Sequence, residues 1–350
     1  MPNYVYAGAA PWIAASKGAV TGGLFRLDSD SGRWEKLTAG LPDEVEARCI
    51  ALGPGGAVYV GTQDGPYRST DAGASWRKLA LPGKEALVWS ILLDPTDPRT
   101  IYIGTQGTTM YRSRDGGESW TELTPPEPLG MVKMSFPCRV IRLALDPSDP
   151  RRLYAGLEVG GVLMSRDGGD SWRGCNEGLL EFTKEPRLRS RIVSDTETEG
   201  MMDSHALEVS PAEPGTVFLA NRMGLFRSGD GGMRWHEIGI ARFSPLTYAR
   251  DVKVSRHDPR TMYAALSVAA VSDEGSLYRS RDLGETWQRF DRGVAMKSTL
   301  MIIAESPRNR NRVYCATRKG QVFGTEDGGE SWREYRLPDG VEGVYGLAAA

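Results

Sequence analysis

The sequence contains few cysteines, no long apolar run and almost no net charge. Its four cysteines include no C-x-x-C pair and no disulfide-dense framework. They lie at Cys49, Cys138, Cys175 and Cys315. We expect reduced thiols that pack in the interior of a cytoplasmic protein. The formal charge of −2 argues against a nucleic-acid binder, because such a protein needs a strong basic excess.

No apolar run approaches the roughly 18 residues that a membrane-spanning helix requires, so the sequence predicts no membrane span. The first residues, Met1-Pro-Asn-Tyr-Val-Tyr-Ala-Gly8, lack the charged and then apolar layout of a signal peptide. They are typical of a strand instead. Both features favour a cytoplasmic location.

A ten-residue motif recurs along the whole chain, and Tyr111-Arg-Ser-Arg-Asp-Gly-Gly-Glu-Ser-Trp120 is a complete copy. Five other full copies end at Trp76, Trp172, Trp235, Trp287 and Trp332, and a degenerate copy ends at Trp34. The Asp side chain can accept hydrogen bonds from N–H groups of its own turn, and the Gly two residues later tolerates a positive φ. The Trp packs near the turn that it follows. Each copy therefore predicts a β-hairpin.

Two more strands precede each motif in the sequence. A Tyr-x-Gly strand such as Tyr59-Val-Gly61 comes directly before it, and an apolar strand that ends in an Asp-Pro turn, such as Ile91-Leu-Leu-Asp94, comes before that. Successive motif tryptophans lie 42 to 63 residues apart. Four strands in a repeat of this length are typical of a β-propeller blade.

The two ends of the sequence complete one repeat between them. The chain opens on a Tyr-x-Gly strand at Tyr6-Ala-Gly8 and closes on an apolar strand at Val344-Tyr-Gly-Leu-Ala348. We expect residues 341–350 to pair with residues 3–37, which would close the ring and remove its free sheet edges. The sequence thus predicts an all-β fold, in which residues 1–350 form a single seven-bladed propeller of four-stranded antiparallel blades.

The motif resembles the BNR or Asp-box repeat of sialidases, sortilin, xyloglucan-hydrolysing enzymes and the photosystem II assembly factor. The resemblance covers essentially the whole chain and implies the propeller fold. It also implies that each box is a structural hairpin on the outer rim, so the boxes receive no catalytic role. Seven blades, with no Arg-Ile-Pro element and no matching Tyr/Glu pair, argue against a sialidase. The assembly factor, a single seven-bladed ring with an arginine patch, is the most similar in architecture.

Insertions lengthen some repeats, at residues 9–22, 124–137, 173–203, 239–248 and 267–276. They fall between successive blades or between the second and third strands of a blade, and both kinds of connection emerge on the same face of a propeller. Because variable loops on a rigid scaffold carry function, we expect this insertion-rich face to be the working surface. Segment 173–203 reads as a solvated loop, a cover over the channel or a partner contact. Pro11-Trp12-Ile13 and Phe243–Tyr248 would add apolar groups to the same face.

Polar residues occupy two aligned positions of the repeat that should surround the central channel on this face. The predicted ligand-binding residues are Arg48, Arg142, Arg222, Arg250, Arg318, Gln63 and Gln106. Guanidinium groups match carboxylate, sulfate and phosphate groups in a bidentate way, so an anionic ligand is expected. In the alternative interpretation the arginines pair with carboxylates in a solvated ring of salt bridges. The partners would be Glu158, Asp203, Asp251 and Glu342.

His205 is the histidine placed for chemistry, with Asp203 two residues earlier on the same side of a strand. Together with Glu158 they are the candidate catalytic residues. One His and one Asp are too few for a metal site, so no cofactor is predicted, although a divalent metal at the channel mouth stays open. Two functions follow. The first is binding of a partner protein or an anionic small molecule or saccharide; the alternative is a lyase or hydrolase acting on an acidic sugar or another carboxylate-bearing substrate.

Overall fold

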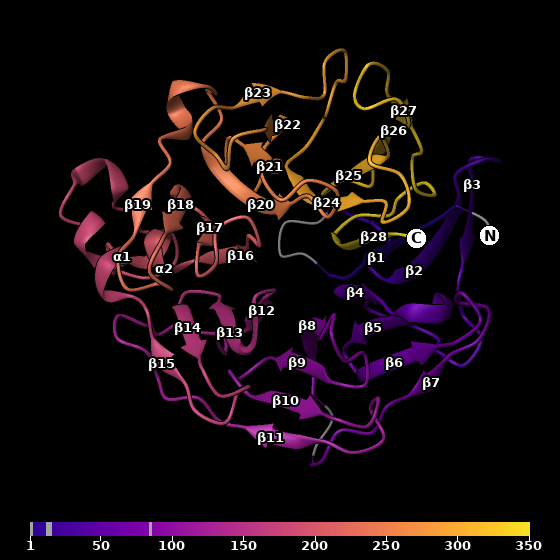
Figure 1. The fold of residues 1–350 in the computed structure, drawn as a ribbon. Helices are drawn as coiled ribbons and strands as arrows, with labels where there is room; N and C mark the ends of the chain where they lie inside the picture. The colour runs from indigo at the N-terminus through magenta and orange to yellow at the C-terminus, as the bar shows by residue number, and fades with distance from the viewer. Residues whose placement is uncertain (1–2, 12–15, 84–85) are drawn as a thin grey trace.

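The computed structural model describes residues 3–11, 16–83 and 86–350, and Figure 1 shows them as a ring of sheets around a central axis. Seven four-stranded antiparallel sheets make up the ring. The predicted seven-bladed β-propeller is therefore confirmed. No helix of the described residues has the length and apolarity needed to cross a membrane.

Each blade runs from an innermost strand at the channel to a short outer strand. Blade 1 comprises β28 (Val344–Ala349), β1 (Tyr4–Ala9), β2 (Gly23–Asp28) and β3 (Arg33–Lys36). Blade 2 comprises β4 (Cys49–Leu52), β5 (Val58–Thr62), β6 (Gly65–Ser69) and β7 (Arg77–Lys78). Blade 3 comprises β8 (Val88–Leu93), β9 (Ile101–Thr105), β10 (Met110–Ser113) and β11 (Thr121–Leu123). Blade 4 comprises β12 (Val140–Asp146), β13 (Asp149–Leu157), β14 (Gly161–Ser165) and β15 (Arg173–Gly174).

The last three blades follow the same order. Blade 5 comprises β16 (Ser204–Val209), β17 (Val217–Asn221), β18 (Gly224–Ser228) and β19 (His236–Glu237). Blade 6 comprises β20 (Tyr248–Val254), β21 (Met262–Ser267), β22 (Gly275–Ser280) and β23 (Gln288–Arg289). Blade 7 comprises β24 (Leu300–Glu305), β25 (Val313–Thr317), β26 (Val322–Thr325) and β27 (Arg333–Glu334). The helices are α1 (Glu177–Phe182), α2 (Glu199–Met202) and three 3₁₀ turns at Pro54–Gly56, Pro186–Leu188 and Ile240–Arg242.

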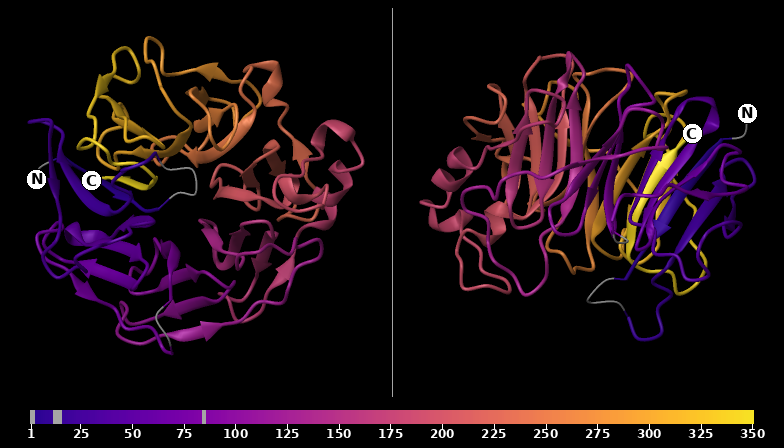
Figure 2. Two further views of the ribbon diagram at one scale, coloured as in Figure 1. Left: turned by 180° about the vertical axis from the view of Figure 1, so that it is seen from behind. Right: turned by 90° about the horizontal axis from the view of Figure 1, so that it is seen from below.

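The ring closes through β28 and β1, which pair antiparallel with Tyr6 opposite Ala348. The left-hand view of Figure 2 shows the N- and C-termini on this one blade. Gly8 of the Tyr-x-Gly strand lies against the next blade, and a Cβ atom there would come within 2.7 Å of the Ala47 carbonyl oxygen. The glycine of this repeated pattern thus permits the close approach of neighbouring blades.

The Asp boxes form the predicted turns. In the box of blade 3, the Asp115 carboxylate accepts hydrogen bonds from the Ser119 N–H at 2.9 Å and the Ser113 hydroxyl at 2.7 Å. Gly117, at φ 95°, directs its N–H to the Ser113 hydroxyl at 2.8 Å. In the degenerate copy the acceptor is instead Asp28, which receives the Asp30 N–H at 3.1 Å.

A contact that the sequence did not predict joins each of several blades to the next one. The Tyr102 hydroxyl and the Arg112 guanidinium of blade 3 both donate to the Gly168 carbonyl in the box of blade 4, at 3.1 and 2.7 Å. In the same way, Tyr6 and Arg26 donate to the Ala72 carbonyl at 2.9 and 2.6 Å. We call this arrangement the interblade latch. It gives the repeated Tyr and Arg a role in packing between blades.

The cysteines are free thiols, and Cys138, Cys175 and Cys315 are buried, as expected for packing residues. Burial raises the pKa of the Cys138 thiol to about 12. A thiol with such a pKa stays protonated and unreactive near neutral pH. The cytoplasmic location itself stays a prediction.

Candidate functional site

The insertions gather at one edge of the ring, as their positions between strands predicted. The right-hand view of Figure 2 shows segment 173–203 and residues 16–22 extending beyond the same edge. Hydrogen bonds tie neighbouring insertions together, for example from the Asn176 side chain to the Leu129 carbonyl at 2.8 Å. Of the predicted apolar groups, Trp12 and Ile13 lie outside the described residues. Leu246 and Tyr248 are buried, so they are not part of the exposed surface.

Segment 173–203 is anchored to the ring. Leu179 and Leu188, together with Met201 and Met202 of α2, pack in one apolar cluster with Val159 of blade 4. The segment contains a basic run at residues 184–191 and an acidic run at residues 195–199. The two runs pair with each other, since Arg189 and Arg191 both contact Glu197. We infer that the segment is a fixed part of this face.

Glu199, which the sequence analysis did not single out, holds the tip of that segment. Its buried carboxylate accepts hydrogen bonds from the N–H groups of Ile192, Val193 and Ser194 and from the Ser194 hydroxyl, at 2.7 to 3.3 Å. Burial alone would raise the pKa of Glu199, but the bonds from Ser194 and its neighbours lower it overall. In the sequence, the acidic run at residues 195–199 was the only sign of this network, and it did not show which carboxylate turns inward.

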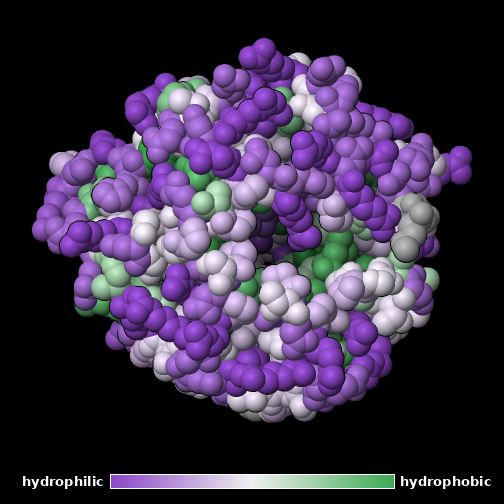
Figure 3. Space-filling view, in the orientation of Figure 1, coloured by the Kyte–Doolittle hydropathy of each residue, from purple (hydrophilic) through white to green (hydrophobic). Residues whose placement is uncertain are grey.

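The central channel contains a cavity of about 110 Å³ between the innermost strands. Its basic lining residues are Arg48, Arg142, Arg250, Lys253 and His205, and no Asp or Glu of the described chain lines it. Figure 3 shows a hollow at the centre of the ring, with hydrophobic residues along one side. The structure thus brings three of the predicted arginines and His205 together at one cavity.

Two of the arginines at the channel enclose an indole ring. The guanidinium carbons of Arg48 and Arg139 lie 4.9 and 4.5 Å from the Trp89 ring centroid, and the Tyr345 ring meets the indole edge-on at 5.5 Å. Cation–π contacts of this kind hold the guanidinium planes in place. Arg48 also pairs with Glu46 at 2.7 Å.

Arg139 joins this stack to Glu158, one of the candidate catalytic carboxylates, at 2.7 Å. Burial raises the pKa of Glu158, the Arg139 charge opposes this shift, and the Asp203 charge adds to it. The ion pair occupies one carboxylate oxygen of Glu158.

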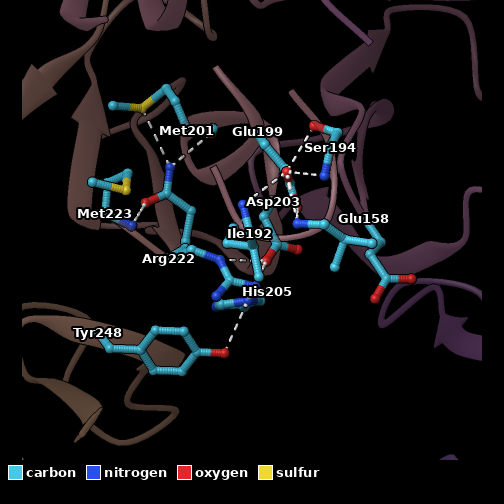
Figure 4. A network of polar contacts seen from close by, with 12 residues as sticks. Glu158, Ile192, Ser194, Glu199, Met201, Asp203, His205, Arg222, Met223 and Tyr248 are labelled. Atoms are coloured by element: carbon cyan, nitrogen blue, oxygen red, sulfur yellow. Dashed lines mark hydrogen bonds and ion pairs between the residues drawn. The ribbon is translucent and has the colours of Figure 1, made fainter. Parts of the chain in front are cut away.

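Asp203 lies at the centre of a second network, which Figure 4 shows. Its Oδ2 atom is 2.9 Å from Arg222 Nη2 and 3.3 Å from His205 Nε2. Burial on its own would raise the pKa of Asp203, but His205, Arg222 and the nearby Arg250 charge lower it to about 2. Asp203 is therefore a carboxylate at neutral pH.

Both ring nitrogens of His205 have partners. Nδ1 lies 2.7 Å from the Ala249 carbonyl, to which it donates, and Nε2 lies 3.4 Å from the Tyr248 hydroxyl as well as near Asp203. Burial lowers the pKa of His205, while the Asp203 charge opposes that shift. The side chain is only 3% exposed. This geometry is typical of a histidine that orders its neighbours.

Two further arginines pair with carboxylates named in the alternative interpretation. Arg142 of β12 reaches Asp251 of β20 at 3.1 Å, past the blade that lies between them. Arg318 lies 3.9 Å from Glu342. With Glu158 and Asp203, all four carboxylates named there contact an arginine. Four of the predicted arginines, Arg48, Arg142, Arg222 and Arg318, are thus in ion pairs, and a role in ligand binding stays a prediction.

The two predicted glutamines belong to the connections that frame the channel. The Gln63 amide accepts from the Glu46 N–H at 2.8 Å and donates to the Glu44 carbonyl at 2.7 Å, which fixes the connection into blade 2. Gln106 forms a backbone bridge with Arg139. Neither residue lines the channel cavity.

The family model for sortilin, also described as neurotensin receptor 3, matches residues 65–209 and 275–347, which is more than half of the chain. The chain belongs to the Sortilin-Vps10 family. The matched segments include Trp89, Asp203 and His205, whereas Arg222 and Arg250 lie between them.

Proteins similar to this member of the Sortilin-Vps10 family include carbohydrate-named enzymes and a peptide-bound propeller. The xyloglucanase Xgh74A of Acetivibrio thermocellus is 26% identical over 172 residues, 42% of this chain and 19% of the enzyme. The GH74 enzyme of Niastella koreensis has a TM-score of 0.62 at 19% identity, covering 85% of this chain and 46% of that one. YCF48 bound to D1 peptide has a TM-score of 0.53 at 14% identity, covering 86% and 89%. The chain spans less than half of either enzyme, and these structural likenesses show the fold.

In this Sortilin-Vps10 family member, no group of three or more His, Cys, Asp or Glu that could hold a metal ion occurs among residues 3–11, 16–83 and 86–350. The pair of His205 and Asp203 is engaged with Arg222 and Tyr248. Cationic hydrogen-bond donors thus surround the small cavity of the channel. The nearby carboxylates Glu158 and Asp203 already pair with arginines.

Proposed function

We propose that this chain is a binding protein that docks a partner protein on its insertion-rich face. The proposal rests on the positions of the large apolar side chains that are exposed to solvent. Among the described residues, six of the seven such side chains lie on the insertions: Val20, Leu129, Ile192, Val193, Val268 and Val271. Val193 is 68% exposed. Apolar side chains gathered on one face of a soluble protein mark a surface that a partner covers.

The channel supports an acidic group on that partner. Five basic side chains line its cavity, among them Arg250 and Arg142, and no acidic side chain of the described residues does. Burial works against the Arg250 charge, but Tyr248, Tyr345 and Asp203 outweigh it and raise the pKa of Arg250. A fixed guanidinium beside an apolar docking surface suits a peptide segment that carries a carboxylate. The similar YCF48 is known bound to D1 peptide, which favours a peptide as the occupant.

A second candidate function, an enzyme acting on an acidic sugar, rests on the 3.3 Å contact between His205 and Asp203. The similar Xgh74A is named as a xyloglucanase, which favours a saccharide substrate. A general base needs a ring nitrogen within reach of a substrate proton. Because both nitrogens of His205 are engaged and the ring is buried, we rank this function second.

The test is site-specific photo-crosslinking in cells of the source organism, with a photoreactive residue at Val193 and, as a matched control, at Met233. Met233 is also exposed but lies in the Asp box of blade 5. We expect a specific partner at Val193 and not at Met233. The purified partner should then bind Ile192→Ser/Val193→Ser at least tenfold more weakly than the unmodified chain or Met233→Ser.

Equal crosslinking at both positions, or an unchanged affinity of the double variant, would contradict the docking proposal. For the enzymatic alternative, the purified chain is incubated with uronic-acid oligosaccharides, and products are separated by chromatography. Turnover that disappears in His205→Gln would favour the enzyme.

A further inference from the structure

A second and larger hollow lies between blades 6 and 7, away from the channel. It has a volume of about 850 Å³, within the range of small-molecule sites. Its walls are the turns between the first and second strands of both blades, which include His257 and Asn311, and the Asp box of blade 7 at Gly328. These turns belong to the edge opposite the insertions, so the proposed docking does not use this groove.

Arginine is the commonest residue type in the groove. The five arginines are Arg279, Arg281, Arg289, Arg292 and Arg310. Arg281, Arg292 and Arg310 are exposed, and within the described chain no carboxylate forms an ion pair with them. Their guanidinium groups are therefore available to a ligand.

Arg279 shows how this groove differs from those between other blades. It donates to the Gly328 carbonyl at 3.2 Å and lies 4.2 Å from the Phe290 ring centroid. The equivalent Arg112 adds an ion pair with Asp170 at 2.8 Å, and Arg227 adds one with Glu285 at 3.0 Å. Arg279 has no ion pair of this kind among the described residues, so its charge is less compensated.

The charge of Arg279 is also disfavoured by its surroundings. Burial lowers the pKa of Arg279, and the neighbouring Arg281 charge lowers it further. An anion placed between the two guanidinium groups would relieve their repulsion.

Four carboxylates also line the groove, and three of them accept hydrogen bonds from turns of blades 6 and 7. Glu305 accepts from the Ser255 hydroxyl and the Arg256 N–H, at 2.6 and 2.7 Å. Asp258 accepts from the Thr261 hydroxyl at 2.7 Å, and Asp327 from the Ser331 hydroxyl. The fourth, Glu330, is exposed. Arg289 already pairs with Asp291 at 3.0 Å, so four other arginines face the four carboxylates of the groove, whose oxygens keep further acceptor lone pairs.

This mixture of groups fits a ligand with both anionic and hydroxyl groups. Arginines hold oxyanions, whereas carboxylates and the amides of Gln288 and Asn311 suit hydroxyl groups. We propose that the groove binds a small polyhydroxylated molecule that carries an oxyanion, either a sugar acid or a sugar phosphate. This site is separate from the channel and does not depend on the proposed docking function.

The test is isothermal titration of the purified chain with glucuronate, glucose 6-phosphate, glucose and inorganic phosphate. We expect one of the two charged sugars to bind at least tenfold more tightly than glucose and than inorganic phosphate. Which one binds distinguishes a carboxylate from a phosphate ligand. Equal binding of inorganic phosphate, or binding of none of the four, would overturn the proposal.

Three variants locate the binding. Arg281→Gln/Arg310→Gln should weaken binding of the charged sugar at least tenfold, and both positions are exposed, so the fold should persist. Arg234→Gln, an exposed arginine in the box of blade 5, is the matched control and should bind as the unmodified chain does. Arg250→Gln tests whether the ligand binds in the channel instead of the groove. Loss of binding in Arg250→Gln with no loss in the double variant would assign the ligand to the channel and overturn the proposal.

Discussion

The carboxylates of the Asp boxes and those of the central channel find their partners over very different distances along the chain. On the Asp-box edge, Asp71 receives its hydrogen bonds from Ser69 and Ser75 in its own turn. Between the innermost strands, Asp251 of β20 contacts Arg142 of β12, 109 residues away. A local network can be repeated in every blade without regard to its neighbours. The contact of Asp251 with Arg142 is particular to one pair of blades, so the channel is where the repeats become different from one another.

The largest expected effect is that of Asp251→Ala. The Asp251 side chain is fully buried, where it contacts Arg142 and accepts the Ile303 N–H at 2.9 Å. Removal of the Asp251 carboxylate leaves the Arg142 guanidinium and the Ile303 N–H without their acceptor, so the unfolding free energy should fall by about 3–5 kcal/mol. Urea denaturation measures the loss. Glu35→Ala is the control, because its pair with Arg26 is exposed and should contribute about 1 kcal/mol or less. Similar losses of unfolding free energy in both variants would contradict the difference that we expect between a buried and an exposed ion pair.

The next effect is the acid sensitivity of the Asp-box edge. Hydrogen bonds from Ser75 and Ser69 lower the pKa of Asp71 to about 2, and those from Ser171 and Ser165 do the same for Asp167. Both values lie below the ordinary 3.8. Since the folded pKa is depressed, the stabilisation is present above about pH 4 and is lost as pH falls through about 2.

We therefore expect thermal unfolding midpoints that fall between pH 4 and pH 2, and a shallower fall in Asp71→Asn/Asp167→Asn. Asp30→Asn serves as a control outside a full box, because the carboxylate contacts the exposed Asn3 side chain. An identical pH dependence in the double variant and the unmodified chain would show that the boxes do not carry this effect.

A smaller effect tests the interblade latch. Tyr102→Phe removes the hydroxyl that donates to the Gly168 carbonyl and should reduce unfolding free energy by about 0.5–1.5 kcal/mol. Tyr154 occupies the same repeat position, yet its buried hydroxyl has no hydrogen-bond partner among the described residues. Tyr154→Phe should therefore be neutral or slightly stabilising. Unfolding free energy is measured by urea denaturation. Equal losses of it in the two variants would show that the hydrogen bond of the latch does not account for the effect of Tyr102→Phe.

The smallest effect on stability is expected on the insertion-rich edge itself. Ile192 and Val193 are exposed, and their contacts with Glu199 come from backbone N–H groups that serine retains. Ile192→Ser/Val193→Ser should thus change unfolding free energy by about 0.5 kcal/mol or less. A loss above about 2 kcal/mol in urea denaturation would mean that these residues stabilise the fold rather than serve as a docking surface.

Features governed by short stretches of sequence were predictable. The seven blades, the pairing of Tyr6 with the terminal strand and the Asp115 turn all follow from residues that repeat at fixed spacing. The latch was missed because Tyr102 and Gly168 are 66 residues apart, and the strand pattern explains a tyrosine equally well without it.

The candidate site was predictable in its residue types but not in its pairing. The repeat placed Arg222 and Asp203 near the channel, but it did not show that the Asp203 carboxylate turns to both Arg222 and His205. Insertions set these orientations, since Asp203 directly follows α2. Insertions have no second copy in the chain against which their conformation could be inferred.

The pairing of β28 with β1 has a consequence for synthesis on the ribosome. Blades 2 to 7 can each assemble as soon as their own residues have emerged, because their four strands are consecutive. β1 pairs with β2, but its other edge must wait for Val344–Ala349, and the backbone groups of that edge stay unpaired until this segment has been made. A chain that stalls just before this segment would have this edge open to strand exchange with another molecule.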